Sequence, residues 1–336
     1  MSEPIDFVVT WVDDNDPKWR AQKTAFETSL SRDDMYKNSN ARYREMGLLK
    51  YWFRGIDKFA PWVNRIHFVT CGHVPKWLNI AHPKLNIVAH RDYMQSKYLP
   101  TFNSNAIELG LYKIQGLCEN FVYFNDDMYI TAPVKKEYFF RGLPCDIYEV
   151  KAIVSFFNSD SIDYIRLNDI GIINRHFGNR ASKTKSFFKK VNLIYPPKTN
   201  IRNLYNLAWN FYIGLSDPHL PVSYRKTDFK KVWDCEYKAL SDTCSHKFRT
   251  PYDISHWIFR YWRLVEGNFI PSNIYKDSKY FLLEDESSEP INAIINQRYK
   301  IICLNDSATT KNFNLIRGKL QSAFNSILPE KCSFEL

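Results

Sequence analysis

Residues 120–134, NFVYFNDDMYITAPV, are the stretch that decides the fold. The apolar run FVYF is typical of a buried strand, and it stops abruptly at Asn125, Asp126 and Asp127. Neighbouring carboxylates raise each other's pKa and resist burial, so a strand that ends in this way needs a physical reason. Two reasons are open at this point: a capped turn, or a bound cation that neutralises the pair.

Other strand-like segments alternate with helical patterns along the chain. The β-rich segments are 5–12 (IDFVVTWV), 65–70 (RIHFVT) and 85–89 (LNIVA). The segments with apolar side chains at helical spacing are 42–59, 104–116 and 311–328. In the second of these, Ser104 is the expected N-cap and Gly116 the expected stop. Strands that alternate with helices predict an α/β fold, Rossmann-like, in which helices flank a mainly parallel sheet.

The pattern changes between residues 155 and 210. Apolar residues take helical spacing there, and basic residues become more frequent from Arg175 to Arg202. We therefore expect one catalytic domain with a helical insertion or lid. The expected ranges are 1–336 for the domain, about 5–150 and 211–336 for the α/β core, and about 155–210 for the insertion.

The composition excludes several classes of protein. No apolar run of the 336 residues approaches the roughly 18 that a membrane span needs, and Met1 to Asp6 lacks a signal peptide's basic start. A cytoplasmic protein is therefore expected. The seven scattered cysteines include no C-x-x-C pair, which favours reduced thiols. The net charge of +10 leaves two interpretations open, an anionic partner or a solvated basic face, and no clustered basic and aromatic motif indicates a nucleic acid.

A second strand near the C-terminus ends as the first does. Residues 299–304 (YKIICL) are followed by Asn305 and Asp306. Open α/β sheets bind ligands beyond the carboxyl ends of their strands, so two strands that end in Asn-Asp indicate a shared site. Acidic groups at such a site suit Mg²⁺ or Mn²⁺, which prefer oxygen ligands and bridge to substrate phosphates. We predict that Asp126, Asp127 and Asp306 hold this ion.

Two further side chains are candidates for chemistry. His219 lies between Pro218 and Pro221, which restrict the backbone and hold the imidazole on a stiff loop. A catalytic role and a structural role both stay open for this histidine. Glu108 lies in the first turn of its predicted helix, where it is either functional or complements the helix dipole.

Residues 245–254 (SHKFRTPYDI) predict the start of another helix. Thr250 is a good N-cap, Pro251 a good first helical residue, and Asp253 completes a variant of the capping box. Arg249 would then stand just before a helix N-terminus, which already favours an anion. A guanidinium there predicts a phosphate-binding site, with an exposed charge as the alternative.

Several separated strings of the chain are required by no generic fold. They are IDFVVTWVDDNDPKW (5–19), the segment from 42 through KFAPWVNRIHFVTCGHVPKWL (58–78), LPTFNSNAIE (99–108) with YFNDDMYI (123–130), PHLP (218–221) with SHKFRTPYDIS (245–255), and ICLND (302–306). In this order they resemble the Stealth family, which includes bacterial capsule hexose-1-phosphate transferases and the catalytic subunit of the lysosomal-enzyme GlcNAc-1-phosphotransferase. The resemblance extends over nearly the whole chain outside 155–210.

The resemblance implies a set of functional residues. The catalytic positions that it implies are Glu108, Asp127, His219, Arg249 and Asp306. Residues of the same blocks are expected to bind substrate: Trp11, Asp13, Asn103, Asn105, Asn125 and Asn305.

The resemblance also implies a reaction. A hexose-1-phosphate would move from a UDP-sugar to a hydroxyl of a capsular or cell-surface polysaccharide, or of a lipid-linked glycan. UMP would be released and a phosphodiester formed. His219 is the expected general base, with Asp127 as the competing candidate. A metal-dependent glycosyltransferase that releases UDP is the alternative activity. The basic surface predicts peripheral contact with the inner face of the cell membrane.

Overall fold

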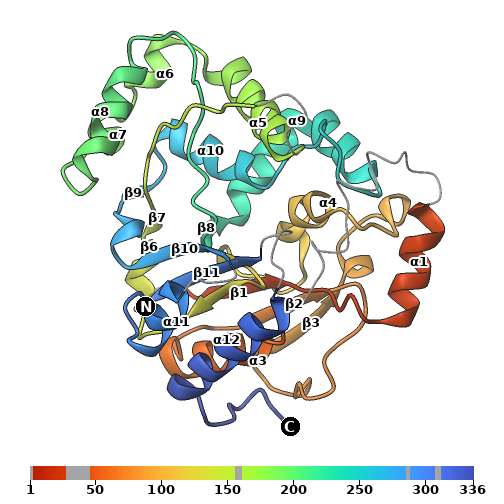
Figure 1. The fold of residues 1–336 in the computed structure, drawn as a ribbon. Coiled ribbons are helices and arrows are strands. Elements are labelled where there is room, and N and C mark those ends of the chain that lie inside the picture. The colour runs from red at the N-terminus through yellow and green to blue at the C-terminus, as the bar shows by residue number, and fades with distance from the viewer. Residues whose placement is uncertain (1–2, 28–45, 156–160, 285–287, 307–311) are drawn as a thin grey trace.

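A five-stranded sheet forms the centre of the chain (Figure 1). The structure is a computed structural model that describes residues 3–27, 46–155, 161–284, 288–306 and 312–336. The strand order is β3-β2-β1-β4-β8. The bounds of these strands are β1 Ile5–Thr10, β2 Ile66–Thr70, β3 Leu85–Ala89, β4 Asn120–Asn125 and β8 Val222–Arg225.

The first four strands are parallel, and β8 pairs antiparallel with β4. The side chains of β1, β2 and β4 are almost continuously buried because helices cover both faces of the sheet. Phe7 and Val9 belong to the hydrophobic cluster on one face, whereas Val8 belongs to the cluster on the other. The predicted α/β fold with a mainly parallel sheet is confirmed. The strand expected at 5–12 is shorter than predicted, since β1 ends at Thr10.

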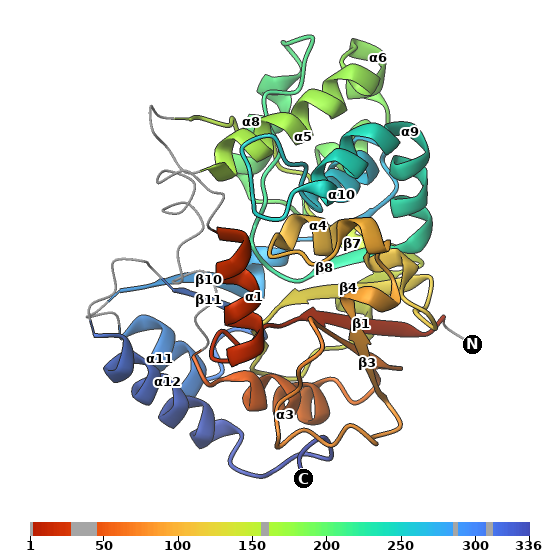
Figure 2. The same ribbon diagram turned by 90° about the vertical axis from the view of Figure 1, so that its right-hand side faces the viewer.

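Helices form a layer on each side of this sheet (Figures 1 and 2). The helices on the first face are α3 Leu49–Phe59, α11 Glu289–Ile295 and α12 Phe313–Ile327. The helices on the second face are α4 Ser104–Leu109, α9 Lys226–Ser245 and α10 Trp257–Glu266. Helix α1, Pro17–Glu27, contributes Trp19 to a small separate cluster with Phe102 and Phe248. No helix of the described ranges is long and apolar enough to cross a membrane.

Two smaller sheets complete the fold. The first has the order β10-β11-β5, with bounds β10 Ser278–Leu283, β11 Ile301–Asp306 and β5 Met128–Ile130. The second has the order β6-β7-β9, with bounds β6 Phe140–Arg141, β7 Leu143–Asp146 and β9 Ile270–Pro271. Strand β5 follows β4 after a two-residue turn and pairs antiparallel with β11. This connection joins the small sheet to the carboxyl end of the main one.

Four helices lie where the sequence predicts a helical insertion. Their bounds are α5 Ser161–Phe177, α6 Arg180–Thr184, α7 Phe187–Lys190 and α8 Pro197–Asn206. Helix α5 places Ile170, Ile172 and Ile173 in the hydrophobic cluster that α9 and α10 share. This helix is therefore part of the second layer. The division into core and insertion stays a prediction, and its residues 156–160 lie outside the described ranges.

Three predicted helices have different bounds in the structure. The helix expected from 42 begins at Leu49, and residues 42–45 lie outside the described ranges. The helix expected at 104–116 ends at Leu109 with Gly110 as its C-cap, and its N-cap is Asn103. The helix at the C-terminus spans Phe313–Ile327, as expected, while Lys311 lies outside the described ranges.

The helix expected at Thr250 is wrong, because α10 begins only at Trp257. Asp253 closes a local turn instead, since its carboxylate accepts the Thr250 backbone N–H at 3.2 Å and the Thr250 hydroxyl at 2.8 Å. The same carboxylate is held by Asn103 and Asn105 of the distant α4 segment. Side-chain bonds of this kind compete with the backbone pattern of a helix.

Candidate functional site

The ends of three separate segments meet at one edge of the main sheet. Thr10, the last residue of β1, is the register partner of Asn125, the last residue of β4. Val222, the first residue of β8, pairs with Tyr123, because β8 runs antiparallel to β4. The loop that precedes β8 therefore reaches the edge where β4 ends, and this loop carries His219.

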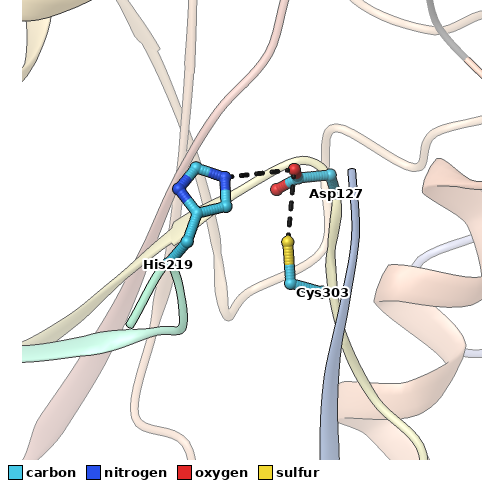
Figure 3. Close-up of side chains that lie close together, drawn as sticks. All are labelled: Asp127, His219 and Cys303. Atoms are coloured by element: carbon cyan, nitrogen blue, oxygen red, sulfur yellow. Dashed lines mark hydrogen bonds and ion pairs between the residues drawn. The ribbon is translucent and has the colours of Figure 1, made fainter. Parts of the chain in front are cut away.

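Asp127 brings His219 and Cys303 together at that edge (Figure 3). His219 Nε2 lies 3.4 Å from Asp127 Oδ2, and the Cys303 thiol donates to the same oxygen at 3.3 Å. The backbone helps to fix this aspartate, since Leu304 N–H donates to the Asp127 carbonyl at 2.9 Å. The two Asn-Asp strand ends therefore lie side by side, as the repeated pattern indicates. They meet because β5 pairs with β11, and not as parallel neighbours in one sheet.

His219 has an unusual backbone and a perturbed imidazole. Its φ is +48°, in the left-handed region that non-glycine residues seldom occupy, which is typical of functional sites. Burial by itself would lower the pKa of His219, but the carboxylates of Asp127, Asp217 and Glu108 outweigh it and raise that pKa above its ordinary value. The His219 side chain is still 38% exposed, so a ligand can reach it.

Glu108 is the buried acid of the site. Burial raises the pKa of Glu108 to about 7, although nearby Arg249 and His219 favour its charged form. The Tyr123 hydroxyl donates to Glu108 Oε1 at 3.1 Å. His256 lies 3.8 Å from the other carboxylate oxygen, and burial lowers the pKa of this histidine to about 3, so it is neutral there. Glu108 is thus electrostatically coupled to both the histidine and the arginine of the predicted set.

Arg249 reaches the start of α4 and not a helix N-terminus of its own. Its Nη2 donates to Ser104 Oγ at 2.5 Å, and Ser104 also hydrogen-bonds Glu108. The prediction that Arg249 directly precedes a helix is wrong, since seven residues separate it from Trp257. Its guanidinium nevertheless lies beside the buried acid of the same site.

The remaining predicted residues of the Asn-Asp ends lie around Asp127. Asp126 occupies the turn between β4 and β5, and Asp306 is the last residue of β11. Asn305 Nδ2 donates to the Tyr280 hydroxyl at 2.7 Å. The Tyr280 ring packs edge-on against His219, with 5.6 Å between ring centroids. Asn305 therefore supports the histidine indirectly, through an aromatic ring.

Metal binding can be judged from the atoms gathered at Asp127. Among the described residues, the His, Cys, Asp and Glu side chains grouped closely enough to hold an ion are Asp127, His219 and Cys303, with ligand atoms within 4.8 Å of one another. Burial raises the pKa of the Cys303 thiol well above its ordinary value, and Asp127 adds to the rise, so Cys303 is a protonated donor. The buried Asp127 Oδ1 has no hydrogen-bond partner in the described ranges and suits a hard cation. Asp126 and Asp306 do not belong to this group, and the predicted metal set stays a prediction.

Trp11 and Asp13 follow β1 at the same edge. Trp11 is 8% exposed and stacks on Phe68 with 5.5 Å between ring centroids. The backbone N–H of Asp13 donates to His73 Nε2 at 2.7 Å, and its carboxylate accepts the Asn15 N–H. As placed, Trp11 belongs mainly to the core, while the Asp13 carboxylate is only partly buried.

Asn103 and Asn105 are buried and committed to protein contacts. Their side-chain amides donate to Asp253 Oδ2 at 2.7 and 3.1 Å, and the Asn103 side-chain oxygen caps α4 by accepting the Asn105 N–H. They hold α4 against the loop that carries Arg249. These contacts position α4 at the site, and the role of the two asparagines as substrate contacts stays a prediction.

Sequence reasoning missed three residues of the site: Cys303, Tyr280 and Ser104. In the sequence, Cys303 is one residue of an apolar strand, and its place two residues before an Asn-Asp end is the available signal. The sequence indicates only a helix cap for Ser104. For Tyr280 the sequence holds no signal, because its contact with His219 depends on the pairing of β10 with β11.

Two family models match the chain. They are described as Stealth protein conserved region 1, which matches residues 3–31, and Stealth protein conserved region 2, which matches residues 42–145.

Curated relatives match it over their whole length. A capsular polysaccharide phosphotransferase WcwK of Streptococcus pneumoniae is 42% identical over 335 residues, which is 99% of this chain and 98% of the relative. The receptor polysaccharide phosphotransferase WefC of Streptococcus gordonii is 36% identical, with 100% of both chains covered. The exopolysaccharide phosphotransferase cps2G of Lactiplantibacillus plantarum is 36% identical over 98% of this chain and 96% of the relative.

Solved structures are much more distant. An active-site mutant of LgtC is similar with a TM-score of 0.36 and 10% identity, covering 94% of this chain and 95% of LgtC. The bifunctional enzyme WbbM gives 0.34 and 8%, with 96% of this chain and 50% of WbbM covered. Similarity this low carries no argument about mechanism. The relatives decide the assignment: the chain belongs to the Stealth family.

Proposed function

We propose that this chain is a polysaccharide phosphotransferase that moves hexose-1-phosphate from a UDP-sugar to a glycan hydroxyl. The hydroxyl oxygen attacks the phosphorus that carries the sugar, and the bond from that phosphorus to the UMP oxygen breaks. The products are UMP and a glycan that carries the sugar through a phosphodiester. The hydroxyl proton passes to a base of the enzyme.

The observation that carries this proposal is the whole-length match to enzymes named as capsular polysaccharide phosphotransferases. The paired Asp127 and His219 agree with it, because phosphoryl transfer needs a placed base and charge stabilisation more than covalent chemistry. A pair of this kind alone would suit several classes of transferase. The donor and the leaving nucleotide are therefore the parts that an experiment must decide.

His219 is the proposed base, and Asp127 is the residue that orients it. Asp127 Oδ2 already has contacts with His219 and Cys303, so this oxygen is poorly placed to take a proton from the acceptor. The imidazole is partly exposed and can receive that proton in its neutral form. A neighbouring carboxylate then stabilises the imidazolium that results.

Arg249 is the proposed phosphate contact. Its guanidinium is partly buried beside Ser104 and Glu108, where a planar donor can hold a phosphate through two parallel bonds. Burial raises the pKa of Glu108 to about 7, so near neutral pH this carboxyl only partly balances the positive charge of the arginine before the substrate arrives. Asp306 completes the proposed catalytic set at the end of β11.

A divalent cation, Mg²⁺ or Mn²⁺, is proposed for the acidic edge of the site. Asp127 Oδ1, with Asp126 and Asp306, would hold it, and the ion would neutralise charge on the pyrophosphate. Asn125, Asn305 and Asp13 at the same edge are proposed substrate contacts, and Trp11, Asn103 and Asn105 are proposed to support them from the core.

The acceptor is proposed to be a polysaccharide or a lipid-linked glycan, handled at the cytoplasmic face of the membrane. The absence of a membrane-crossing helix from the described ranges and the net charge of +10 agree with peripheral contact.

Identification of the nucleotide product tests the proposal. The enzyme would be incubated with UDP-sugar and acceptor polysaccharide, and the nucleotides separated by chromatography. UMP is expected, with His219→Ala lowering its yield by about 10²–10⁴-fold as expected for loss of a general base. UDP as the main product would assign the chain to the sugar-only glycosyltransferases.

A further inference from the structure

Helix α8 buries polar side chains and exposes apolar ones, the reverse of a helix that packs against a hydrophobic core. Its buried residues are polar: Thr199, Asn203 and Asn206 are 3%, 2% and 1% exposed. Asn203 is fully bonded there, since its side-chain oxygen accepts the Val150 N–H and its amide donates to the Tyr148 carbonyl. Asn203 thus anchors the protein side of the helix through hydrogen bonds, and the apolar residues remain for the other side.

The outer side of α8 and the preceding loop carry large apolar side chains in the open. Leu193 is 101% exposed and Ile201 is 67% exposed. The exposed side chains that we call the α7–α8 surface are Phe188, Leu193, Ile201, Leu204, Tyr205 and Trp209. Single exposed apolar residues are ordinary, but six within 22 residues of chain mark an interaction surface. Figure 1 shows α7 and α8 together at one corner of the molecule, away from the five-stranded sheet.

The chain segment that forms this surface carries charge of one sign, although Glu149 and Glu236 of other segments pair with its Arg202 and Arg175. Between Asp169 and Asp217 the sequence has no acidic residue. The exposed basic residues of the same stretch are Arg175, Arg180, Lys185, Lys198 and Arg202. An anionic partner is favoured wherever this part of the chain makes contact.

We propose that the α7–α8 surface docks the protein on an anionic lipid bilayer. Exposed Leu193 and Ile201 would enter the acyl boundary, while Tyr205 and Trp209 suit the headgroup level, as in interfacial amphipathic helices. Nearby lysines would meet the lipid phosphates. A second copy of the chain fits less well, because it would bring a like-charged surface against this one. A glycan fits less well, since the exposed leucine and isoleucine side chains have no hydrogen-bond donors or acceptors for sugar hydroxyls.

The proposal rests on the peripheral membrane contact proposed above, to which it assigns a surface, and it does not depend on the phosphotransferase reaction. Binding to vesicles needs neither donor nor acceptor, so failure of one proposal leaves the other standing.

Co-sedimentation with vesicles tests the docking surface. The vesicles contain equal parts phosphatidylglycerol and phosphatidylcholine, and vesicles of phosphatidylcholine alone are the comparison. The wild-type protein should bind the vesicles that contain phosphatidylglycerol and should not bind those of phosphatidylcholine alone. The double variant Leu193→Ser/Ile201→Ser should bind at least about tenfold more weakly, because it removes inserted apolar groups. The double variant Lys185→Ala/Lys198→Ala should bind these vesicles about fivefold more weakly for each lysine removed.

Matched controls lie elsewhere on the surface. Ile80→Ser changes an isoleucine that is 60% exposed, and Lys18→Ala/Lys50→Ala changes two exposed lysines outside the segment. These should bind as the wild type, and all variants should keep its unfolding midpoint. The proposal is overturned if the wild type does not bind phosphatidylglycerol vesicles, or if either test variant binds as tightly as its control. It is also overturned if sedimentation without lipid finds a dimer that Ile201→Ser breaks.

Discussion

Asp127 Oδ2 faces a thiol donor on one side and an imidazole on the other. At the residue scale this contact explains why the carboxylate is retained at a strand end. The aspartate raises the pKa of His219 and aims its ring, while Cys303 fixes the aspartate. The two oxygens of Asp127 thereby have different roles: Oδ2 acts on the histidine, and Oδ1 stays available to a cation.

The first prediction concerns the charge of Asp127. Asp127→Asn removes a carboxylate that raises the pKa of His219, so this pKa should fall and the imidazole should lose its proton at lower pH. An NMR titration of His219 in chelator, without divalent metal, measures the shift. Asp234→Asn, which alters an acid that is 63% exposed, should change nothing. An unchanged or higher pKa of His219 in Asp127→Asn would refute the pairing.

The second prediction separates the thiol's hydrogen bond from its volume. Cys303→Ala removes the donor to Asp127 and should lower kcat by about tenfold, the effect of one bond to a charged group, with KM for the donor little changed. Cys303→Ser keeps a donor and should retain most of kcat. Steady-state kinetics of the two variants decide the matter. Equal kcat losses in both would show that only packing at this buried position is important.

At the element scale, α4 and the 249–253 loop form one unit. The Asp253 carboxylate accepts hydrogen bonds from Asn103, Asn105 and Thr250, which lie within a few residues of Glu108 and Arg249 in the chain. The unit positions the arginine and the buried acid relative to each other. Local order at this point comes from side chains and not from a helix.

The third prediction tests that unit. Asp253→Asn leaves buried donors without an acceptor of the right charge and should lower the free energy of unfolding by about 2–4 kcal/mol. Urea unfolding measures this, with Asp234→Asn as the matched surface control, expected to change stability by less than about 0.5 kcal/mol. A loss no larger than in the control would mean that the asparagine amides bond elsewhere.

The elements that the sequence predicts well are those with a strong local signal. Strands β1, β2, β3 and β4 are predominantly apolar and β-rich, so their positions were predictable within two residues. Strand β8 has only four residues and was not predicted, although its antiparallel pairing is what brings His219 to the site. The site could be predicted as a set of residues, but its geometry depends on pairings between distant segments.

The helix start at Thr250 shows why local signals fail. The string TPYD has every local feature of a capping box. Asn103 and Asn105, about 150 residues away in the chain, hold Asp253 in a turn instead. The phosphate-binding role of Arg249 stays a prediction, and its guanidinium reaches the site by a hydrogen bond to Ser104 at the start of α4.

At the scale of the whole molecule, two sheets meet where β4 continues into β5, and the acids lie at that junction. The fourth prediction concerns the cation proposed there. Excess EDTA should suppress turnover, and Mg²⁺ or Mn²⁺ should restore it, because the clustered acids and the donor pyrophosphate repel one another without it. Initial rates in chelator and after metal addition measure this. Full activity in excess chelator would leave Arg249 as the proposed phosphate contact without a metal.

The central claim is that the enzyme breaks a bond to phosphorus and never the bond between the anomeric carbon and its oxygen. The fate of the phosphate attached to the sugar tests it most directly. A UDP-sugar labelled with ³²P in that phosphate would be incubated with enzyme and acceptor, and the polymer separated from the nucleotides. The account predicts labelled polysaccharide and unlabelled UMP in equal amounts. Unlabelled polysaccharide that has gained sugar, together with labelled UDP, would contradict it.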